Sequence, residues 1–414
     1  MIDDSLLPEK TGTDSSQKAI FRRIAENNIR RRFFLAKEFS LLGANVLFIR
    51  AELSPKGSPE RFEFRESGGI SQLLIKIPSS GKDMLRIKEL ICFSSVLSDN
   101  HASLAGLFLP DAVICSGILP FCTASAAKIA EAADSVLITE FPCSPKELLT
   151  GLGFFSAINP VLALLKRCVN SALAKSDAVL GFFPDAQQAF SAARNLYPMN
   201  YPAPAEAEKH SARSKEIREA LFALREGGCF VLAFCGRLES GSSIEELISV
   251  CSGFGDKFSL VLFGGGIKEH ALRKFIGEKG ITNVFFVDEL SFDELPFALS
   301  GADAVFISES DYIKGGASEH ERFFSAFLAG RPVLASAERY SDFFRKSGGT
   351  VIIKSHHKES IRLGIKTLME MTDGDREILG LSCREFAEKN SPEVFAKDYF
   401  SLIDNLVKQK EIKK

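Results

Sequence analysis

The chain has 414 residues, 45% of them apolar and 25% charged, and a formal net charge of −2. This length exceeds one ordinary hydrophobic core and suits two domains of about 200 residues each. A nearly neutral chain lacks the basic surplus that binds nucleic acid, so nucleic acid is not expected as a partner.

The N-terminal half alternates predicted helices with short apolar strands. Residues 1–28 begin with a polar, aperiodic stretch and are expected to form a disordered or loose arm. A helix is predicted from Ile29 to Gly43, because apolar residues recur there at helical spacing before a closing glycine. Later apolar runs without alternation are typical of parallel strands buried on both faces. These runs are Asn45–Ile49, Leu73–Ile77, Ala112–Cys115, Ser135–Thr139 and Ala178–Phe182, with helices predicted at Ala124–Ala132 and Pro160–Lys175.

A proline-containing stretch and the charged run Glu206–Glu226 separate this half from a second α/β series, so residues 206–228 are predicted to be a linker. Helices are predicted at Ile244–Cys251 and Glu269–Glu278, and an amphipathic last helix at Val394–Lys408. Six strands are predicted, at Phe230–Cys235, Phe258–Phe263, Asn283–Val287, Ala304–Ile307, Pro332–Ala335 and Thr350–Ile353.

Strands that alternate with helices imply right-handed βαβ crossovers and a mainly parallel sheet. The expected fold class is therefore α/β, with two Rossmann-like domains. The first is expected at residues 29–205 and the second at residues 229–393. A C-terminal helix at residues 394–414 is expected to pack back across the linker.

Glycines between a strand and a helix are the first candidate for ligand chemistry. Gly264–Gly266 follow a predicted strand, so their N–H groups are placed to face an anion at the next helix N-terminus. Glu269 stands where the dinucleotide fingerprint G-x-G-x-x-G requires its third small residue. The glycines therefore fit a tight turn at least as well as an anion site.

The segment Glu319–Ala335 is the second candidate, a helix rich in Phe that ends at Gly330 before a buried strand. Glu319 and Glu321 either complement the helix dipole or meet ribose hydroxyls or a sugar at the carboxyl edge of the sheet.

Taken in order, these motifs resemble family 4 glycosyltransferases, a retaining family with the GT-B fold. The similarity runs with gaps from about Ile29 to Tyr399. Its motifs in the C-terminal half are Phe234–Leu238, Leu260–Gly266, Asn283–Phe286, Glu294–Pro296, Ala302–Ala304 and Leu328–Ala335. In the N-terminal half Ile138–Gly153, Asn159-Pro160 and Lys175–Val179 are similar to the region that lines the acceptor cleft.

The resemblance implies two Rossmann-like domains that face each other across a cleft. A nucleotide-sugar, UDP- or GDP-linked, would be held by the C-terminal domain, and a glycan or lipid-linked acceptor by the N-terminal one. It further implies transfer with retention of configuration, with no metal and no other cofactor.

Individual residues acquire expected roles from this resemblance. Arg237 matches the arginine that faces the diphosphate, where negative charge develops as the glycosidic bond breaks. Glu319 and Glu321 complete the expected catalytic set, and Glu140, after a strand, is expected on the acceptor side. The expected donor-binding residues are Gly236, Arg237, Gly265, Gly266, Arg322, Phe323 and Ser325.

Several positions depart from the family pattern. Ser242 stands where the family has a lysine, and Ser325 stands where it has the second glutamate of a pair. A hydrogen bond to a charged group contributes ~1.5–3 kcal/mol. Loss of both the lysine and the glutamate is therefore expected to weaken donor binding by several kcal/mol if nothing replaces them. Residues 1–28 also offer no counterpart of the family's first strand and glycine-rich acceptor loop.

Two functions follow as alternatives. One is a glycosyltransferase of cell-surface polysaccharide synthesis, and the other is a catalytically eroded GT-B protein that acts as a binding or partner subunit. Asp373-Gly374-Asp375 is expected to be a turn, and the neighbouring histidines His356 and His357 make a poor metal pair, so no metal site is expected.

The expected location is cytoplasmic, because the nine cysteines form no C-x-x-C pair and the N-terminus lacks a signal-peptide pattern. Seven basic residues and one acid lie between Lys18 and Lys37, interleaved with apolar residues. This segment is either a solvated helix face or a basic amphipathic surface for peripheral contact with the inner face of the membrane.

Overall fold

The chain is divided into two compact units in the computed structural model. The first comprises Met1–Tyr201, Gly315–Ala317 and Glu393–Lys414, and the second Pro202–Lys314 and Ser318–Pro392. The structure describes residues 1–3, 29, 31–54, 61–79, 87–116, 122–141, 167, 170, 174–181, 196–198, 210–238, 243–266, 268–288, 290–291, 293–308 and 317–412.

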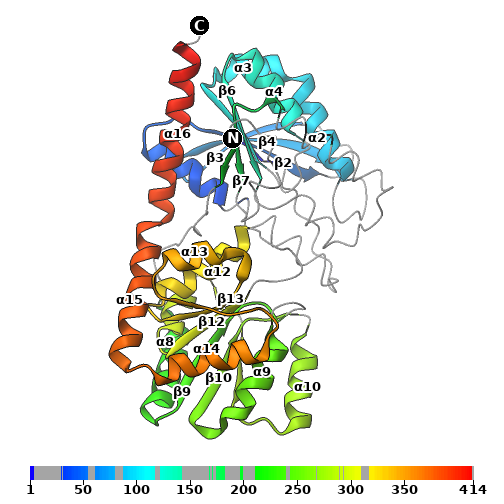
Figure 1. Cartoon of the computed structure of the whole chain (residues 1–414). Coiled ribbons are helices and arrows are strands. Elements are labelled where there is room, and N and C mark those ends of the chain that lie inside the picture. Colours follow the sequence, from blue (N-terminus) through cyan, green and yellow to red (C-terminus); the bar gives the residue numbers. More distant parts are fainter. Residues whose placement is uncertain are drawn as a thin grey trace. The chain divides into compact units, whose positions relative to one another are not determined.

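The first unit is built on an eight-stranded sheet with the order β3-β4-β2-β1-β5-β6-β7-β8 (Figure 1). All neighbouring strands are parallel except β3, which runs antiparallel to β4. Apart from β3, the strands run outward from β1 in both directions, so the strand order reverses between β1 and β5. The strands are β1 (Ile2–Asp3), β2 (Leu47–Ser54), β3 (Phe62–Ser67), β4 (Ile70–Pro78), β5 (Ala112–Ser116), β6 (Val136–Phe141), β7 (Ala178–Gly181) and β8 (Leu196–Pro198).

Helices cover both faces of this sheet. On one face α2 (Ile87–Asp99), α3 (His101–Phe108) and α4 (Thr123–Ala132) pack on Val113 and its neighbours. On the other face the helix at residues 31–41 and α16 (Pro392–Ile412) pack on Ile114 and its neighbours. Consecutive β5 residues thus enter opposite cores, which is why the strand has an unbroken apolar run. The predicted C-terminal helix is confirmed as α16. Its described side chains pack on the sheet of the first unit, and its packing across the linker stays a prediction.

The expectation that residues 1–28 form a loose arm without the first strand is wrong for their first residues. Ile2 pairs in parallel with Ile49 and Cys115, and Asp3 pairs with Arg50 and Ser116. A strand of two residues has no readable period, yet β2 and β5 complete its hydrogen bonds from both sides. Residues 4–28 lie outside the described residues.

The second unit contains a six-stranded parallel sheet with the order β11-β10-β9-β12-β13-β14. Numbered along the chain, this is the doubly wound order 3-2-1-4-5-6. Each of the strands predicted for this half is confirmed to within one residue at either end. The strands are β9 (Phe230–Cys235), β10 (Phe258–Phe263), β11 (Val284–Val287), β12 (Ala304–Ser308), β13 (Val333–Ser336) and β14 (Thr350–Ile352).

Residues 206–228 are not simply a linker, which corrects the prediction. The charged run forms α8 (Ala212–Glu226), capped by Ser211, whose side chain accepts the Ser214 N–H at 3.1 Å. Leu221 of α8 is buried in the core of the second unit, so the charges of this helix are its solvated face. The other helices of this unit are α9 (Ile244–Cys251), α10 (Glu269–Lys279), α11 (Leu295–Leu299), α12 (Ala317–Leu328), α13 (Ser341–Lys346), α14 (Lys358–Glu370) and α15 (Asp373–Lys389) (Figure 1).

Candidate functional site

The strand order of the second sheet identifies its ligand edge. Open α/β sheets bind ligands outside the carboxyl ends of the strands, where the strand order reverses. Here the reversal lies between β9 and β12, which are neighbours with Ala233 opposite Val305. Gly236 and Arg237 follow β9 directly, so the topology places them at this edge.

The glycines at this edge allow two loop backbones to touch. Leu238, after β9, donates its N–H to the carbonyl of Gly265, after β10, at 3.2 Å. A Cβ on Gly264 would lie 2.1 Å from the carbonyl oxygen of Gly236, and one on Gly266 would lie 2.3 Å from that of Leu238. Close backbone packing therefore explains two of the three glycines. Donor contact by Gly236, Gly265 and Gly266 stays a prediction.

Two of the predicted donor-binding arginines approach the same strand end. Arg237 is partly exposed beside Gly236. Burial raises the pKa of the Cys235 thiol to about 12, and the positive charge of Arg322 on α12 opposes this shift. An effect of Arg322 on the last residue of β9 means that its guanidinium lies within electrostatic range of this edge. The fold thus places the charge of Arg322 near the strand that Arg237 follows.

The helix that carries Arg322 begins at the same edge, because α12 follows β12 in a βαβ unit. Glu319 and Glu321 lie near the start of α12, and their side chains lie outside the described residues. The N-terminus of a helix of this length carries a partial positive charge that favours anions.

Phe323 and Ser325 are buried in the same helix. Phe323 is 1% exposed, and its ring centroid lies 5.0 Å from that of Tyr340 and 4.9 Å from that of Phe344. Ser325, at the position of the family's glutamate, is 3% exposed. We assign Phe323 to core packing rather than to donor contact, because the helical period turns it toward the same core as Phe327.

A pair of hydroxyl groups at this edge was not predicted from the sequence. Ser243, before α9, has its Oγ 3.1 Å from Oγ of the buried Ser336, and it accepts the His356 N–H at 3.0 Å. Ser243 and His356 both have positive φ, at 50° and 55°, which is uncommon outside glycine and recurs at functional sites. The available signal was that Ser336 ends a strand and that Ser243 and His356 lie in segments that follow strands. Ser242, the position of the family's lysine, precedes Ser243 in the sequence and lies outside the described residues.

The histidine pair and the D-x-D segment, neither of which is expected to bind a metal, have local structural roles. His357 caps α14 by accepting the Ser360 N–H at 3.1 Å, and Nδ1 of His356 lies 3.6 Å from a carboxylate oxygen of Glu246. Asp375 forms a capping box with Thr372 at the start of α15, so the D-x-D segment begins a helix. Across the described ranges, no group of three or more His, Cys, Asp or Glu side chains is arranged to hold a metal ion.

In the first unit, Glu140 lies at the carboxyl end of β6, as predicted, but its carboxylate is already engaged. It is 4% exposed, accepts a hydrogen bond from the Tyr399 hydroxyl at 2.6 Å and lies 3.6 Å from Nε of Arg32. These contacts link β6 to the helices that cover the sheet. We therefore assign Glu140 a structural role rather than contact with an acceptor.

The basic segment 18–37 is described only at residues 29 and 31–37. Arg31 and Arg32 are buried there, which corrects the prediction that they contribute to a solvated or membrane-facing surface, whereas Lys37 is exposed. None of the described helices is long and apolar enough to cross a membrane.

Comparison with known proteins shows the fold. No protein-family model and no curated protein sequence matches the chain. Among solved structures, HepE from Anabaena in complex with UDP and glucose is 14% identical, with a TM-score of 0.59, over 97% of this chain and 98% of that one. Sucrose-phosphate synthase from Thermosynechococcus elongatus is 12% identical, with a TM-score of 0.64, over 98% of both chains.

A third similar structure, α,α-trehalose 6-phosphate synthase from Burkholderia multivorans, is 11% identical, with a TM-score of 0.63, over 100% of this chain and 97% of that one. These three structures share the GT-B fold with this chain. The predicted α/β fold class with two Rossmann-like domains, the GT-B fold, is thereby confirmed.

Proposed function

We propose that this protein is a glycosyltransferase that moves a sugar from a nucleotide-sugar donor to a glycan or lipid-linked acceptor in cell-surface polysaccharide synthesis. The observation that carries this proposal is the position of Arg237 just after β9, where the strand order reverses, with the charge of Arg322 acting on the last residue of the same strand. The complexes of the similar HepE with UDP and with UDP-glucose favour a UDP-linked donor.

The proposed chemistry rests on charge at the leaving group. As the bond between sugar and diphosphate breaks, negative charge grows on the diphosphate. The guanidinium groups of Arg237 and Arg322 supply positive charge and hydrogen-bond donors, and the N-terminus of α12 adds a favourable dipole. We propose a metal-independent reaction, because these groups provide the counter-charge that a divalent cation provides in other transferases. Retention of configuration is proposed from the family resemblance.

Glu319 and Glu321 are proposed to hold the ribose or the sugar, since they lie near the start of α12, close in sequence to Arg322. Carboxylates are suitable for this task because they accept two hydrogen bonds from neighbouring hydroxyl groups. The acceptor is proposed to bind the first unit without Glu140, whose carboxylate is held by Tyr399 and Arg32.

A second candidate function is a binding or partner subunit that has lost catalysis. Ser325 favours it, because a buried serine stands where the family has a ribose-binding glutamate. Such a protein would retain the fold and would bind a nucleotide weakly or not at all.

Calorimetric titration with UDP, UDP-glucose and GDP-mannose, together with an assay of UDP or GDP release, tests both candidates. We expect at least one donor to bind, and Arg237→Met to weaken that binding about 10- to 100-fold, since a charge-assisted hydrogen bond is lost. Arg322→Met is also expected to weaken donor binding. Arg273→Met is the matched control, because this α10 arginine is exposed and pairs with Glu269.

The outcomes separate the candidates. Binding with nucleotide release that depends on Arg237 supports the enzyme. Donor binding without release, over a panel of sugar and lipid-linked acceptors, supports the partner subunit. The absence of heat with every donor favours the partner subunit and contradicts the proposed donor site. Equal affinity of the wild type and Arg237→Met also contradicts that site.

A further inference from the structure

Three arginines of the second unit converge at the edge of the sheet opposite the candidate donor site. Arg218 and Arg225 lie on α8, which precedes β9, and Arg331 lies two residues before β13. All three approach the segment Ser300–Asp303, which precedes β12. They therefore gather at the amino ends of the parallel strands.

Each guanidinium is anchored through its Nε. Arg218 donates to Oγ of Ser300 at 2.9 Å, and Arg331 donates to the carbonyl oxygen of Ser300 at 2.8 Å. Arg225 donates to Oδ1 of Asp303 at 2.8 Å. These anchors hold the side chains in place and leave the terminal nitrogens of each fork for other partners.

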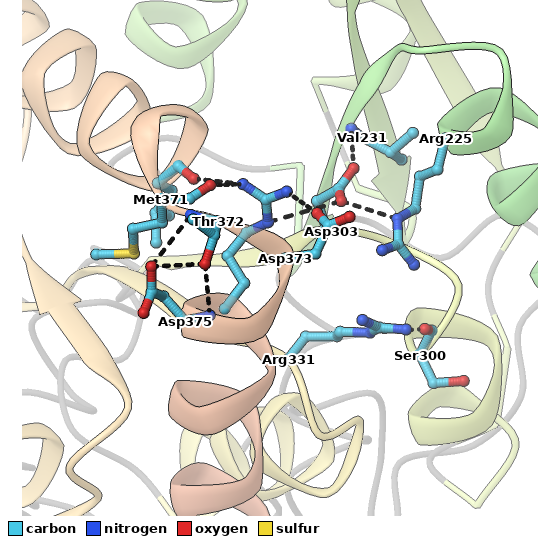
Figure 2. A network of polar contacts seen from close by, with 11 residues as sticks. Arg225, Val231, Ser300, Asp303, Arg331, Met371, Thr372, Asp373 and Asp375 are labelled. Atoms are coloured by element: carbon cyan, nitrogen blue, oxygen red, sulfur yellow. Dashed lines mark hydrogen bonds and ion pairs between the residues drawn. The ribbon is translucent and has the colours of Figure 1, made fainter.

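The terminal nitrogens of Arg218, Arg225 and Arg331 make no hydrogen bond to any of the residues that the structure describes. Figure 2 shows the terminal nitrogens of Arg225 directed toward the guanidinium of Arg331. Two cations directed toward each other repel unless an anion or water lies between them. Burial lowers the pKa of Arg331, and Arg225 and Arg218 lower it further, whereas Asp303 and Glu377 oppose the shift.

The acidic groups nearby do not offset this charge. Asp303 is the buried carboxylate of the network, and besides Arg225 it accepts the Val231 N–H at 2.8 Å (Figure 2). Arg376 lies 3.9 Å from Asp303 and is satisfied by Asp373 and two backbone carbonyls. With Asp303 and Glu377 counted against Arg218, Arg225 and Arg331, a positive charge remains.

The backbone around these arginines is closely packed. A Cβ on Gly301 would lie 2.6 Å from the carbonyl oxygen of Arg218, so α8 lies directly against the segment that anchors the three side chains. Side chains that are held before a ligand arrives lose little entropy on binding.

We propose that Arg218, Arg225 and Arg331 form a binding site for an oxyanion of the phosphate class, inorganic phosphate or a phosphomonoester, separate from the donor edge. Guanidinium forks match the geometry of phosphate oxygens, and a tetrahedral dianion can receive three forks from different directions. A planar carboxylate has one charge and two oxygens, so it satisfies fewer of these donors.

Calorimetry with inorganic phosphate and with glucose 6-phosphate, at constant ionic strength set by chloride, tests the proposal. We expect one or both anions to bind the wild type and to raise its melting temperature. Arg331→Met is expected to weaken binding about tenfold or more, because it removes one fork. Arg218→Met is a second variant with the same expected loss. Among the described contacts it removes the hydrogen bond to the Ser300 hydroxyl and a cation–π contact with the Phe297 ring.

Two controls locate the site. Arg213→Met removes an exposed arginine of the same helix that pairs with Asp288, and it is expected to leave phosphate binding unchanged. Arg237→Met removes the cation at the donor edge, and the part of phosphate binding that depends on Arg331 and Arg218 is expected to remain in this variant. If the nucleotide-sugar proposal fails, phosphate binding that depends on Arg331 and Arg218 is still expected.

The outcomes are distinct. Glucose 6-phosphate that binds at least about tenfold more tightly than phosphate supports a phosphomonoester, and equal affinities support inorganic phosphate. No binding of either anion overturns the proposal. So does phosphate binding that Arg237→Met abolishes while Arg331→Met and Arg218→Met retain it.

Discussion

The Tyr399 hydroxyl donates a hydrogen bond of 2.6 Å to Oε1 of Glu140, and so joins α16 to β6 across 259 positions of the sequence. Nε of Arg32 lies 3.6 Å from the other carboxylate oxygen. All three side chains are buried, and a buried carboxylate without such partners is costly. This contact helps to explain why the last helix belongs to the first unit although it follows the second in the sequence.

Tyr399→Phe is expected to lower the free energy of unfolding by about 2 kcal/mol, because it removes a hydrogen bond to a buried charged group and keeps the ring. Urea denaturation followed by circular dichroism measures this change. Ser401→Ala on the exposed face of the same helix serves as the control, with an expected effect near zero. In a double-mutant cycle with Glu140→Gln the two losses should not add, and additive losses would show that the contact is not formed.

Gly266→Ala is expected to lower the free energy of unfolding by about 2–4 kcal/mol, since the new methyl group would overlap the backbone of Leu238. Gly277→Ala is the matched control. Gly277 lies inside α10 with nothing within 4 Å of the added carbon, so alanine there is expected to stabilise the protein by about 0.5–1 kcal/mol. Thermal and urea unfolding of both variants test this contrast, and equal effects of the two substitutions would contradict it.

Asp303→Asn is expected to destabilise the second unit by about 3 kcal/mol or more. The substitution preserves the volume of the side chain but removes the charge that Arg225 and Arg376 face in a buried position. Asp342→Asn, at an aspartate that is 89% exposed and pairs with Arg345, should change stability by less than about 0.5 kcal/mol. The free energy of unfolding in urea is the measurement, and a loss at Asp303 no larger than at Asp342 would count against the network.

Buried thiols should be chemically inert in the folded protein. Burial raises the pKa of the Cys235 thiol to about 12 and that of Cys383 to about 11. At pH 8 we expect iodoacetamide to modify the partly exposed Cys92 and Cys229 and to leave Cys235 and Cys383 unmodified, as measured by peptide mass spectrometry. Alkylation of Cys235 as fast as that of Cys229 would be inconsistent with its burial.

The same pKa shifts determine how stability depends on alkaline pH. The folded state keeps these thiol protons to a higher pH than the unfolded chain, in which a thiol ionises near pH 8.5. Their contribution to stability is therefore fully present below that pH and decreases as the pH rises toward about 11 to 12. Urea midpoints at pH 8 and pH 10 should show the decrease, and a Cys235→Ser/Cys383→Ser variant should show a smaller one.

The strands of the second unit could be predicted from the sequence because parallel strands buried on both faces leave short apolar runs. Phe230–Cys235 and Phe258–Phe263 have the predicted bounds, and each is followed by glycine. Three strands of the first unit were not predictable in this way. Ile2–Asp3 and Leu196–Pro198 are too short to have a period, and Phe62–Ser67 is exposed over most of its length.

The sequence by itself therefore determined the buried parallel strands of the second unit and the position of Arg237 after a strand end, since both depend on neighbours within a few residues. The partners of the charged groups were decided only by the tertiary structure. Glu140 is engaged by Arg32 and Tyr399, from opposite ends of the chain. Whether a charge at a strand end faces a ligand or a buried partner depends on long-range contacts, which local periodicity does not reveal.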